Sequence, residues 1–318
     1  MPLPQTVYLR RRLGALGVLA GLAALAGVAV GAGGDDREGG PRSAAARAVA
    51  AKAQAPPPPE LPGGGRRIFP DRRVVAFYGA PQAPELGELG IGSPDSAARR
   101  LRKQAEPYER RTRPVLPAFE LLAVIANADP GADGLYRARQ DSKVIRRYLR
   151  AARRAKALLI LDVQPGHADF LDEVRRLDRW LREPDVGIAL DPEWHTPGAK
   201  PGTVIGSVGA EKVNQVARHV AKIVRDGNLP QKLFVVHQFT PDMVAGKQQV
   251  IQPRELAVTM NVDGFGTRSA KVSKYRLFTT DGKRFHDGFK LFYREDTGLM
   301  KPRSVLGLKP PPDLVVYE

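Results

Sequence analysis

The chain has 318 residues, with 50 lysines and arginines against 34 acidic residues, and it has no cysteine. The missing cysteines exclude disulfide bonds, thiolate zinc sites and a cysteine nucleophile. The formal charge of +16 is densest over residues 99–113 and 146–156, where solvated helix faces are expected. These faces predict attraction to an anionic envelope polymer or a membrane surface. Nucleic acid is not expected as a partner, because no motif of that class is present.

The first 32 residues have the pattern of a targeting segment. Arg10, Arg11 and Arg12 precede an uncharged stretch, Leu13–Ala32, which ends in small residues suited to cleavage. This stretch is 20 residues long, so both a cleaved signal peptide and a membrane anchor are open. Either one predicts a secreted or membrane-anchored protein with its folded part outside the cytoplasm, because the arginines stay inside.

Residues 33–70 have the composition of a tether. They contain an Ala-rich stretch, the proline run Pro56–Pro59 and the glycine run Gly63–Gly65, and such composition does not bury a core. Residues 71–318 then form one folded domain of a size typical of a (β/α)8 barrel.

Short apolar runs alternate with helical patterns along this domain, which predicts an α/β fold, a (β/α)8 TIM-type barrel. The last outer helix is expected to be absent or supplied from the N-terminal side. The first predicted helix begins at Ser93-Pro94-Asp95. The others cover Asp141–Arg154, Asp169–Leu181, Ala210–Val224 and Val272–Phe278. The eight predicted strands are Val74–Gly79, Val115–Ile125, Ala157–Gln164, Val186–Glu193, Leu233–Phe239, Glu255–Asp263, Phe289–Tyr293 and Leu314–Tyr317.

Polar residues gather where these strands end, and the carboxyl ends of barrel strands carry the active site in this fold. Asp191 and Glu193 are two positions apart, so in a strand they share one face, and such a pair raises the pKa of one member. The candidate catalytic residues are Glu193, Asp191, Asp162 and Asp263. The candidate substrate-binding residues are Tyr78, Glu120, Gln164, Trp194, His237, Gln238, Asn261 and Tyr293.

Paired carboxylates and aromatic rings suit the cleavage of a glycosidic bond, which needs a protonated acid and a second carboxylate. The segment Val186-Gly187-Ile188-Ala189-Leu190-Asp191-Pro192-Glu193 resembles the strand-four signature of family 18 glycoside hydrolases, Asp-Gly-x-Asp-x-Asp-x-Glu. The resemblance implies that Glu193 is the acid and that Asp191 positions the substrate's acetamido group. Val186 and Ala189 replace two aspartates of the signature. The Asp-x-Glu pair is also similar to family 25 muramidases.

The sequence therefore predicts a glycosidase-type hydrolase of envelope or extracellular polysaccharide, acting as a monomer without a cofactor. Phosphate-binding glycine motifs and the Gly-x-Ser-x-Gly motif of serine hydrolases are absent. Two alternatives stay open. The same acids with His237 can form a metal-dependent hydrolase, or the barrel can bind wall polymer without catalysis.

Overall fold

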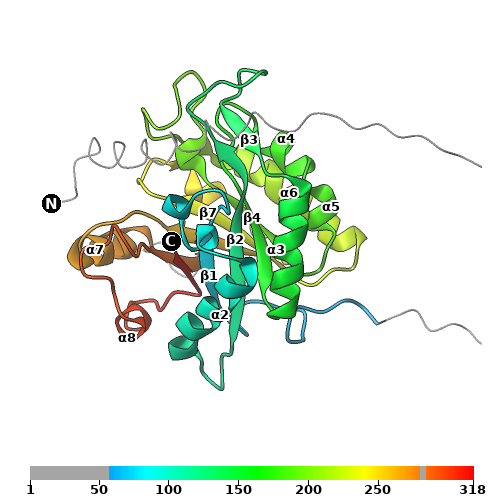
Figure 1. Ribbon diagram of the computed structural model, residues 1–318, viewed down its shortest axis with the longest axis vertical. Coiled ribbons are helices and arrows are strands. Elements are labelled where there is room, and N and C mark those ends of the chain that lie inside the picture. Colours follow the sequence, from blue (N-terminus) through cyan, green and yellow to red (C-terminus); the bar gives the residue numbers. More distant parts are fainter. Residues whose placement is uncertain (1–56, 280–283) are drawn as a thin grey trace, which may run out of the picture.

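The structure is a computed structural model that describes residues 57–279 and 284–318. Within these residues, eight parallel strands pair side by side, and the last pairs with the first to close a barrel (Figure 1). The predicted TIM-type barrel is therefore confirmed. In order around the barrel, the strands are β1 (Arg73–Gly79), β11 (Leu314–Tyr317), β10 (His286–Leu291), β9 (Leu256–Val262), β7 (Lys232–Gln238), β5 (Val186–Leu190), β4 (Leu158–Val163) and β2 (Val115–Ala126).

Helices cover the outside of the barrel and begin where the sequence provides capping groups. The Ser93 hydroxyl accepts a hydrogen bond from the backbone N–H of Ser96 at the start of α2, and Asp141 caps α3 in the same way. The segment predicted as one helix after β4 is divided into α4 and α5. The helices are α2 (Pro94–Ala105), α3 (Ser142–Arg154), α4 (Phe170–Arg175), α5 (Asp178–Leu181), α6 (Ala210–Asp226), α7 (Arg268–Phe278) and α8 (Pro302–Leu306).

Short strands and 3-10 helices lie in the loops that connect the barrel strands and the outer helices. The strand β3 pairs antiparallel with the end of β2, and β6 pairs with β8. No helix of the described part of the chain is long and apolar enough to cross a membrane. The predicted targeting segment, residues 1–32, and the start of the predicted tether lie outside the described residues. These elements are β3 (Arg137–Arg139), β6 (Val208–Gly209), β8 (Val244–Ala245), η1 (Pro84–Leu86), η2 (Glu88–Gly90), η3 (Glu106–Tyr108), η4 (Pro192–Trp194) and η5 (Lys247–Gln249).

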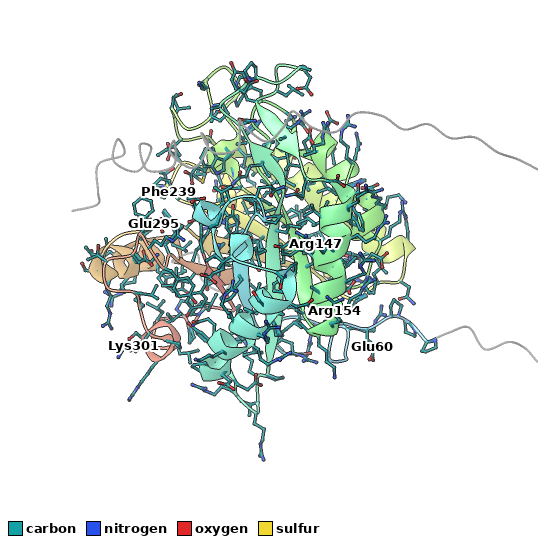
Figure 2. The ribbon with its side chains drawn as sticks, in the orientation of Figure 1. Glu60, Arg147, Arg154, Phe239, Glu295 and Lys301 are labelled. Atoms are coloured by element: carbon teal, nitrogen blue, oxygen red, sulfur yellow. The ribbon has the colours of Figure 1, made fainter. Side chains whose placement is uncertain are left out.

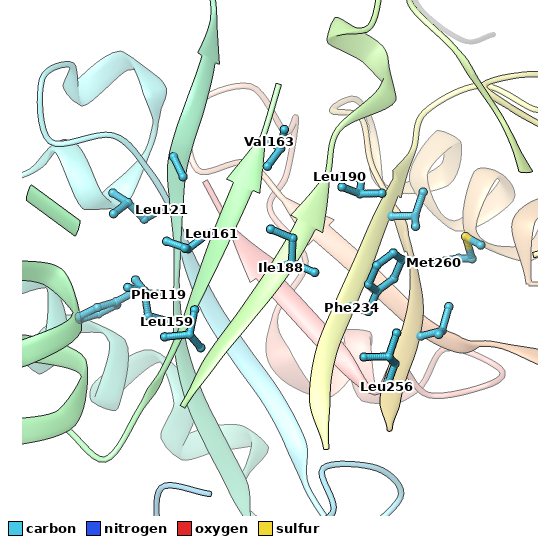
Figure 3. Packing of buried hydrophobic residues seen from close by; sticks show 14 of the residues in the cluster. Phe119, Leu121, Leu159, Leu161, Val163, Ile188, Leu190, Phe234, Leu256 and Met260 are labelled. Carbon is cyan, nitrogen blue, oxygen red and sulfur yellow. The ribbon is translucent and has the colours of Figure 1, made fainter. Parts of the chain in front are cut away.

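Two hydrophobic cores follow from the alternation of side chains along each strand. Outward residues such as Phe119, Leu161 and Phe234 pack against the helices and form the larger core (Figure 3). Inward residues such as Val74 and Leu233 fill the barrel near the amino ends of its strands. The inside is therefore a packed core at that end, and polar chemistry is confined to the opposite end.

The predicted tether ends too late in the sequence. Leu61, Ile68 and Phe69 are at most 4% exposed and belong to the core inside the barrel. The run Gly63–Gly65 forms a tight turn. Its three glycines have φ of 81°, 90° and 78°, a left-handed backbone conformation that residues with a side chain rarely adopt. The Gln231 side chain accepts a hydrogen bond from the N–H of Ile68. Residues 61–69 therefore form a plug under the barrel rather than a free spacer.

A buried lysine also lies at this end of the barrel. Lys232 begins β7 and is 1% exposed, and its Nζ donates hydrogen bonds to the carbonyl oxygens of Glu183 and Val186. Burial lowers the pKa of Lys232 to about 7, although the carboxylates of Asp185 and Glu183 oppose this effect. The ammonium form is therefore costly in the folded state.

We expect Lys232→Met to change the pH dependence of stability. The unfolded chain keeps the lysine proton up to about pH 10.4, whereas the folded chain releases it above about pH 7. The unfolded state therefore binds more protons in this window, and the free energy of unfolding rises by up to about 1.4 kcal/mol per pH unit. Urea unfolding between about pH 7 and about pH 9 should show that Lys232→Met removes this rise. Lys222→Met, on the exposed side of α6, should keep it, and equal slopes in the two variants would contradict the assignment.

Candidate active site

Every barrel strand places a polar side chain inside the barrel, near or just beyond its carboxyl end in seven strands and midway along the longer strand β2 at Glu120. Parallel strands point their carboxyl ends to one side, and the two-residue alternation turns the same set of positions inward. The register aligns Tyr78 with Glu120 and His237 with Asn261 on neighbouring strands. All members are buried except the partly exposed Glu318. We call this set the polar layer, and it consists of Tyr78, Glu120, Asp162, Asp191, His237, Asn261, Lys290 and Glu318.

The imidazole of His237 lies between two carboxylates. Its Nε2 is 3.0 Å from Glu120 Oε1, and its Nδ1 is 3.0 Å from Asp263 Oδ2. Burial alone lowers the pKa of His237, but the hydrogen bonds to Asp263 and Glu120 outweigh it and hold the pKa well above its usual value. The two carboxylates therefore favour the imidazolium form of His237, in which both ring nitrogens donate.

A second chain of hydrogen bonds connects two aspartates. The Tyr78 hydroxyl donates to Asp162 Oδ2 at 3.0 Å and accepts from Gln164 Nε2 at 3.1 Å. The same Nε2 lies 3.3 Å from Asp191 Oδ2. Burial, with the nearby Asp162 and Asp191 charges, raises the pKa of Tyr78 well above 10, so its hydroxyl stays a donor. These hydrogen bonds fix the positions of the Asp162 and Asp191 carboxyl groups relative to each other.

Asp162 differs from an ordinary surface aspartate in its protonation. Burial raises its pKa well above the usual value, and the charges of Asp191 and Glu120 add to this effect. The positive charges of His237 and Lys290 oppose it without cancelling it. Since Tyr78 donates to Oδ2, the proton of a neutral Asp162 belongs on Oδ1.

Two charged members of the polar layer were missed in the sequence. Lys290 Nζ is 3.2 Å from Asp263 Oδ2, 2.7 Å from Glu318 Oε2 and 3.7 Å from the centre of the Tyr78 ring. The sequence carried a signal for Lys290, because a charged residue between two apolar residues of a predicted strand points to the other face of that strand. Lys290 lies between Phe289 and Leu291 in the same way as Glu120 lies within an apolar run. Lys290 neutralises part of the acidic charge of the layer.

Several oxygens of the polar layer have no hydrogen-bond partner among the described residues. They are fully buried, and a buried acceptor without a donor costs free energy. Asp162 Oδ1 offers a proton when this acid is neutral, and the other three oxygens offer acceptors to a ligand that carries hydroxyl or ammonium donors. The oxygens are Glu120 Oε2, Asp162 Oδ1, Asp191 Oδ1 and Asn261 Oδ1.

The segment that resembles the family 18 signature is only partly a strand. β5 ends at Leu190, and Glu193 lies on the short 3-10 helix η4, so Asp191 and Glu193 do not share a strand face as predicted. Glu193 is 3% exposed, and η4 packs against β7, the strand that carries His237. Inside the barrel, a Cβ on Gly187 would lie 2.8 Å from the carbonyl oxygen of Leu233, so the position requires glycine.

Four predicted substrate-binding residues are not members of the polar layer, and one of these, Gln164, is hydrogen-bonded to it through Tyr78 and Asp191. Tyr293 follows the end of β10, stacks on Tyr317 at 5.3 Å and donates to Gln104, so it belongs to the outer core and its prediction as a barrel-mouth residue is wrong. Trp194 is buried against Ala126. Gln238 points to the opposite side of β7 from His237 and donates to the carbonyl oxygen of Thr240.

Glu120, Asp162 and His237 each offer one ligand atom, and these atoms lie within 4.8 Å of one another. This spacing is compatible with a divalent ion. In the arrangement described, however, the Nε2 of His237 is already hydrogen-bonded to Glu120 and its Nδ1 to Asp263. A cation would have to displace a proton from the imidazolium before His237 could bind it.

No protein-family model matches this chain, and no curated protein sequence matches it. Among solved structures, it is similar to the xylanase and alpha-amylase inhibitor protein XAIP-II from Scadoxus multiflorus, with 11% identity, 77% of this chain and 92% of that chain covered, and a TM-score of 0.45. It is also similar to a catalytic lysine mutant of Ruminococcus gnavus sialic acid aldolase, with 12% identity, 78% and 67% covered, and a TM-score of 0.39. The fold is established by the closed strand pairing itself.

Proposed function

We propose that the protein is an extracytoplasmic hydrolase that cleaves glycosidic bonds of envelope or extracellular polysaccharide in the polar layer. The observation that carries the proposal is the pair Asp162 and Asp191, two buried carboxyl groups that Tyr78 and Gln164 connect. Glycoside hydrolysis needs one neutral and one ionised carboxyl group on the two sides of the scissile bond.

In this proposal Asp162 is the general acid, in place of Glu193 suggested by the motif. Its raised pKa supplies the proton, and the unbonded Oδ1 can deliver it to the leaving oxygen. Asp191 is the second carboxylate, which either activates water or attacks the anomeric carbon. The free oxygens of Glu120 and Asn261 accept hydrogen bonds from sugar hydroxyls.

The burial of the layer restricts how a polysaccharide can enter. Glu120, Asp162 and Asp191 are 0% exposed, so the loops above them must move to admit a substrate. An internal segment of a polymer needs an open groove with two exits, whereas a chain end needs only one entrance. We therefore propose that the enzyme acts on the terminal sugar of a chain.

Product analysis tests this proposal. End-labelled oligosaccharides from envelope and extracellular polymers are incubated with the protein, and the products are separated by size over time. Release of a single sugar from one end is expected at early times. Release of mid-sized fragments would contradict action at a chain end but leave glycosidic cleavage intact.

A control with a chelator separates this chemistry from a metal-dependent hydrolase. Carboxylate acid–base catalysis should be unaffected by ethylenediaminetetraacetate, because neither carboxyl group needs a cation for its role. Activity that is lost with chelator and restored by Zn²⁺ or Mn²⁺ would overturn the proposed roles. Binding of the oligosaccharides without turnover on any of them would instead favour a non-catalytic polymer-binding barrel.

A further inference from the structure

Two neighbouring helices present a strongly basic surface to solvent. α2 and α3 bury their small and apolar residues against the barrel and turn their charged residues outward. Figure 2 shows Arg147 and Arg154 on the outward side of α3. We call the exposed cations of these helices that form no ion pair with any described residue the basic face, and they are Arg99, Arg102, Lys103, Lys143, Arg146, Arg147 and Arg150.

Unpaired positive charge is not a feature of every exposed helix of this protein. α6 is longer and its lysines and arginines are also exposed to solvent, yet each of them pairs with an acid. The pairs are Lys212 with Asp169, Arg218 with Glu211, Lys222 with Asp226 and Arg225 with Glu255. Single exposed cations without an ion pair also occur on other described elements, such as Arg179 on α5 and Arg276 on α7, but α2 and α3 bring seven of them together on adjacent helices.

We propose that the basic face is a docking surface for a bilayer that contains anionic phospholipid. Five of its seven cations are arginines, whose planar guanidinium groups bind phosphate oxygens in pairs. The cations are spread along the ridges of two helices on the outer side of the barrel, which suits an extended charged plane rather than one discrete anion. Ile91, an exposed apolar residue just before α2, is 37% exposed and can contact the interface beside the charges.

The expected strength of bilayer binding follows from the number of cations on the basic face. Each basic residue near an anionic bilayer contributes about 1 kcal/mol at physiological ionic strength. Removing four of the seven should therefore weaken the partition coefficient roughly 100-fold to 1000-fold. The interaction is also screened by salt, because the Debye length falls from about 10 Å at about 0.1 M to about 3 Å at about 1 M.

Vesicle sedimentation with the full chain tests the proposal. The face variant carries Arg99→Gln, Arg102→Gln, Arg146→Gln and Arg150→Gln. The matched control carries four substitutions to glutamine on α6, at Lys212, Arg218, Lys222 and Arg225, so both variants have the same net charge. Each protein is mixed with phosphatidylcholine vesicles that contain or lack phosphatidylglycerol, at low and high salt, after its melting temperature confirms folding.

The ratio of binding to the two vesicle types gives the outcome. We expect the wild type and the α6 control to prefer vesicles with phosphatidylglycerol, and the face variant to lose this preference. Equal loss in both variants would overturn the proposal, since net charge alone would then explain binding. No preference in the wild type, with salt-sensitive binding to a soluble polyphosphate or to nucleic acid, would overturn the choice of a lipid partner.

Discussion

Asp162→Asn is expected to lower kcat about 10²–10⁴-fold on a responsive oligosaccharide, because asparagine keeps the shape of the side chain but cannot give up a proton. The amide has one acceptor oxygen instead of two, so the hydrogen bond from the Tyr78 hydroxyl is kept when this oxygen takes the place of Asp162 Oδ2. Steady-state kinetics with the end-labelled substrate measure the change. KM should shift little, since the lost group acts on the leaving oxygen.

The same substitution should not destabilise the protein at neutral pH. The folded chain keeps the Asp162 proton to a higher pH than the unfolded chain, because the folded pKa is raised. The folded state therefore binds more protons above about pH 4, and its stability falls as the pH rises through this window. Asparagine has no such dependence, so Asp162→Asn is expected to be as stable as the wild type or more stable, increasingly so toward the folded pKa.

Two further variants decide which carboxyl group is the acid. Asp172→Asn, an exposed aspartate on α4, is the matched control and should keep full activity. Glu193→Gln should lower activity less than Asp162→Asn if the proposed roles are correct. If Glu193→Gln abolishes turnover while Asp162→Asn stays active, the acid is Glu193 and the resemblance to the family 18 signature identified it correctly.

The fold could be predicted from the sequence because barrel strands carry a strong local signal. Apolar runs such as Ala157–Leu161 are buried on both sides, and helical segments such as Val144–Leu149 separate them. The hydrophobic period of each segment and the alternation of strands with helices together predict the barrel. Asp162, His237 and Asn261 could be placed at the active end for the same reason, since parallel strands bring their carboxyl ends together.

Other features depend on contacts that no local pattern encodes. Asp191 and Glu193 look like strand neighbours, but Pro192 starts a 3-10 turn there, and the turn rather than the strand sets the direction of Glu193. The ion pair of Lys290 with Glu318 depends on the pairing of β10 with β11, which brings together residues 28 positions apart in the sequence. Residues 61–69 were predicted to be a spacer because glycine and proline dominate their composition, and their burial follows only from the open end of the barrel above them.

A chain that begins at Asp71 is expected to be far less stable than one that begins at Pro57. The shorter chain lacks Leu61, Ile68 and Phe69, which fill the amino end of the barrel. Full burial of three such side chains contributes roughly 5–9 kcal/mol, which is comparable with the whole stability of a typical domain. We expect the chain from Pro57 to unfold cooperatively in urea and the chain from Asp71 to be unfolded or aggregated.

Point variants in the longer chain separate packing from length. Phe69→Ala should cost about 3–5 kcal/mol, because it opens a cavity against the inner core. Glu60→Ala, at an exposed position beside the plug (Figure 2), should change the free energy of unfolding by less than about 0.5 kcal/mol. A fully stable chain from Asp71, or equal effects of the two point variants, would show that residues 61–69 rest on the barrel without closing it.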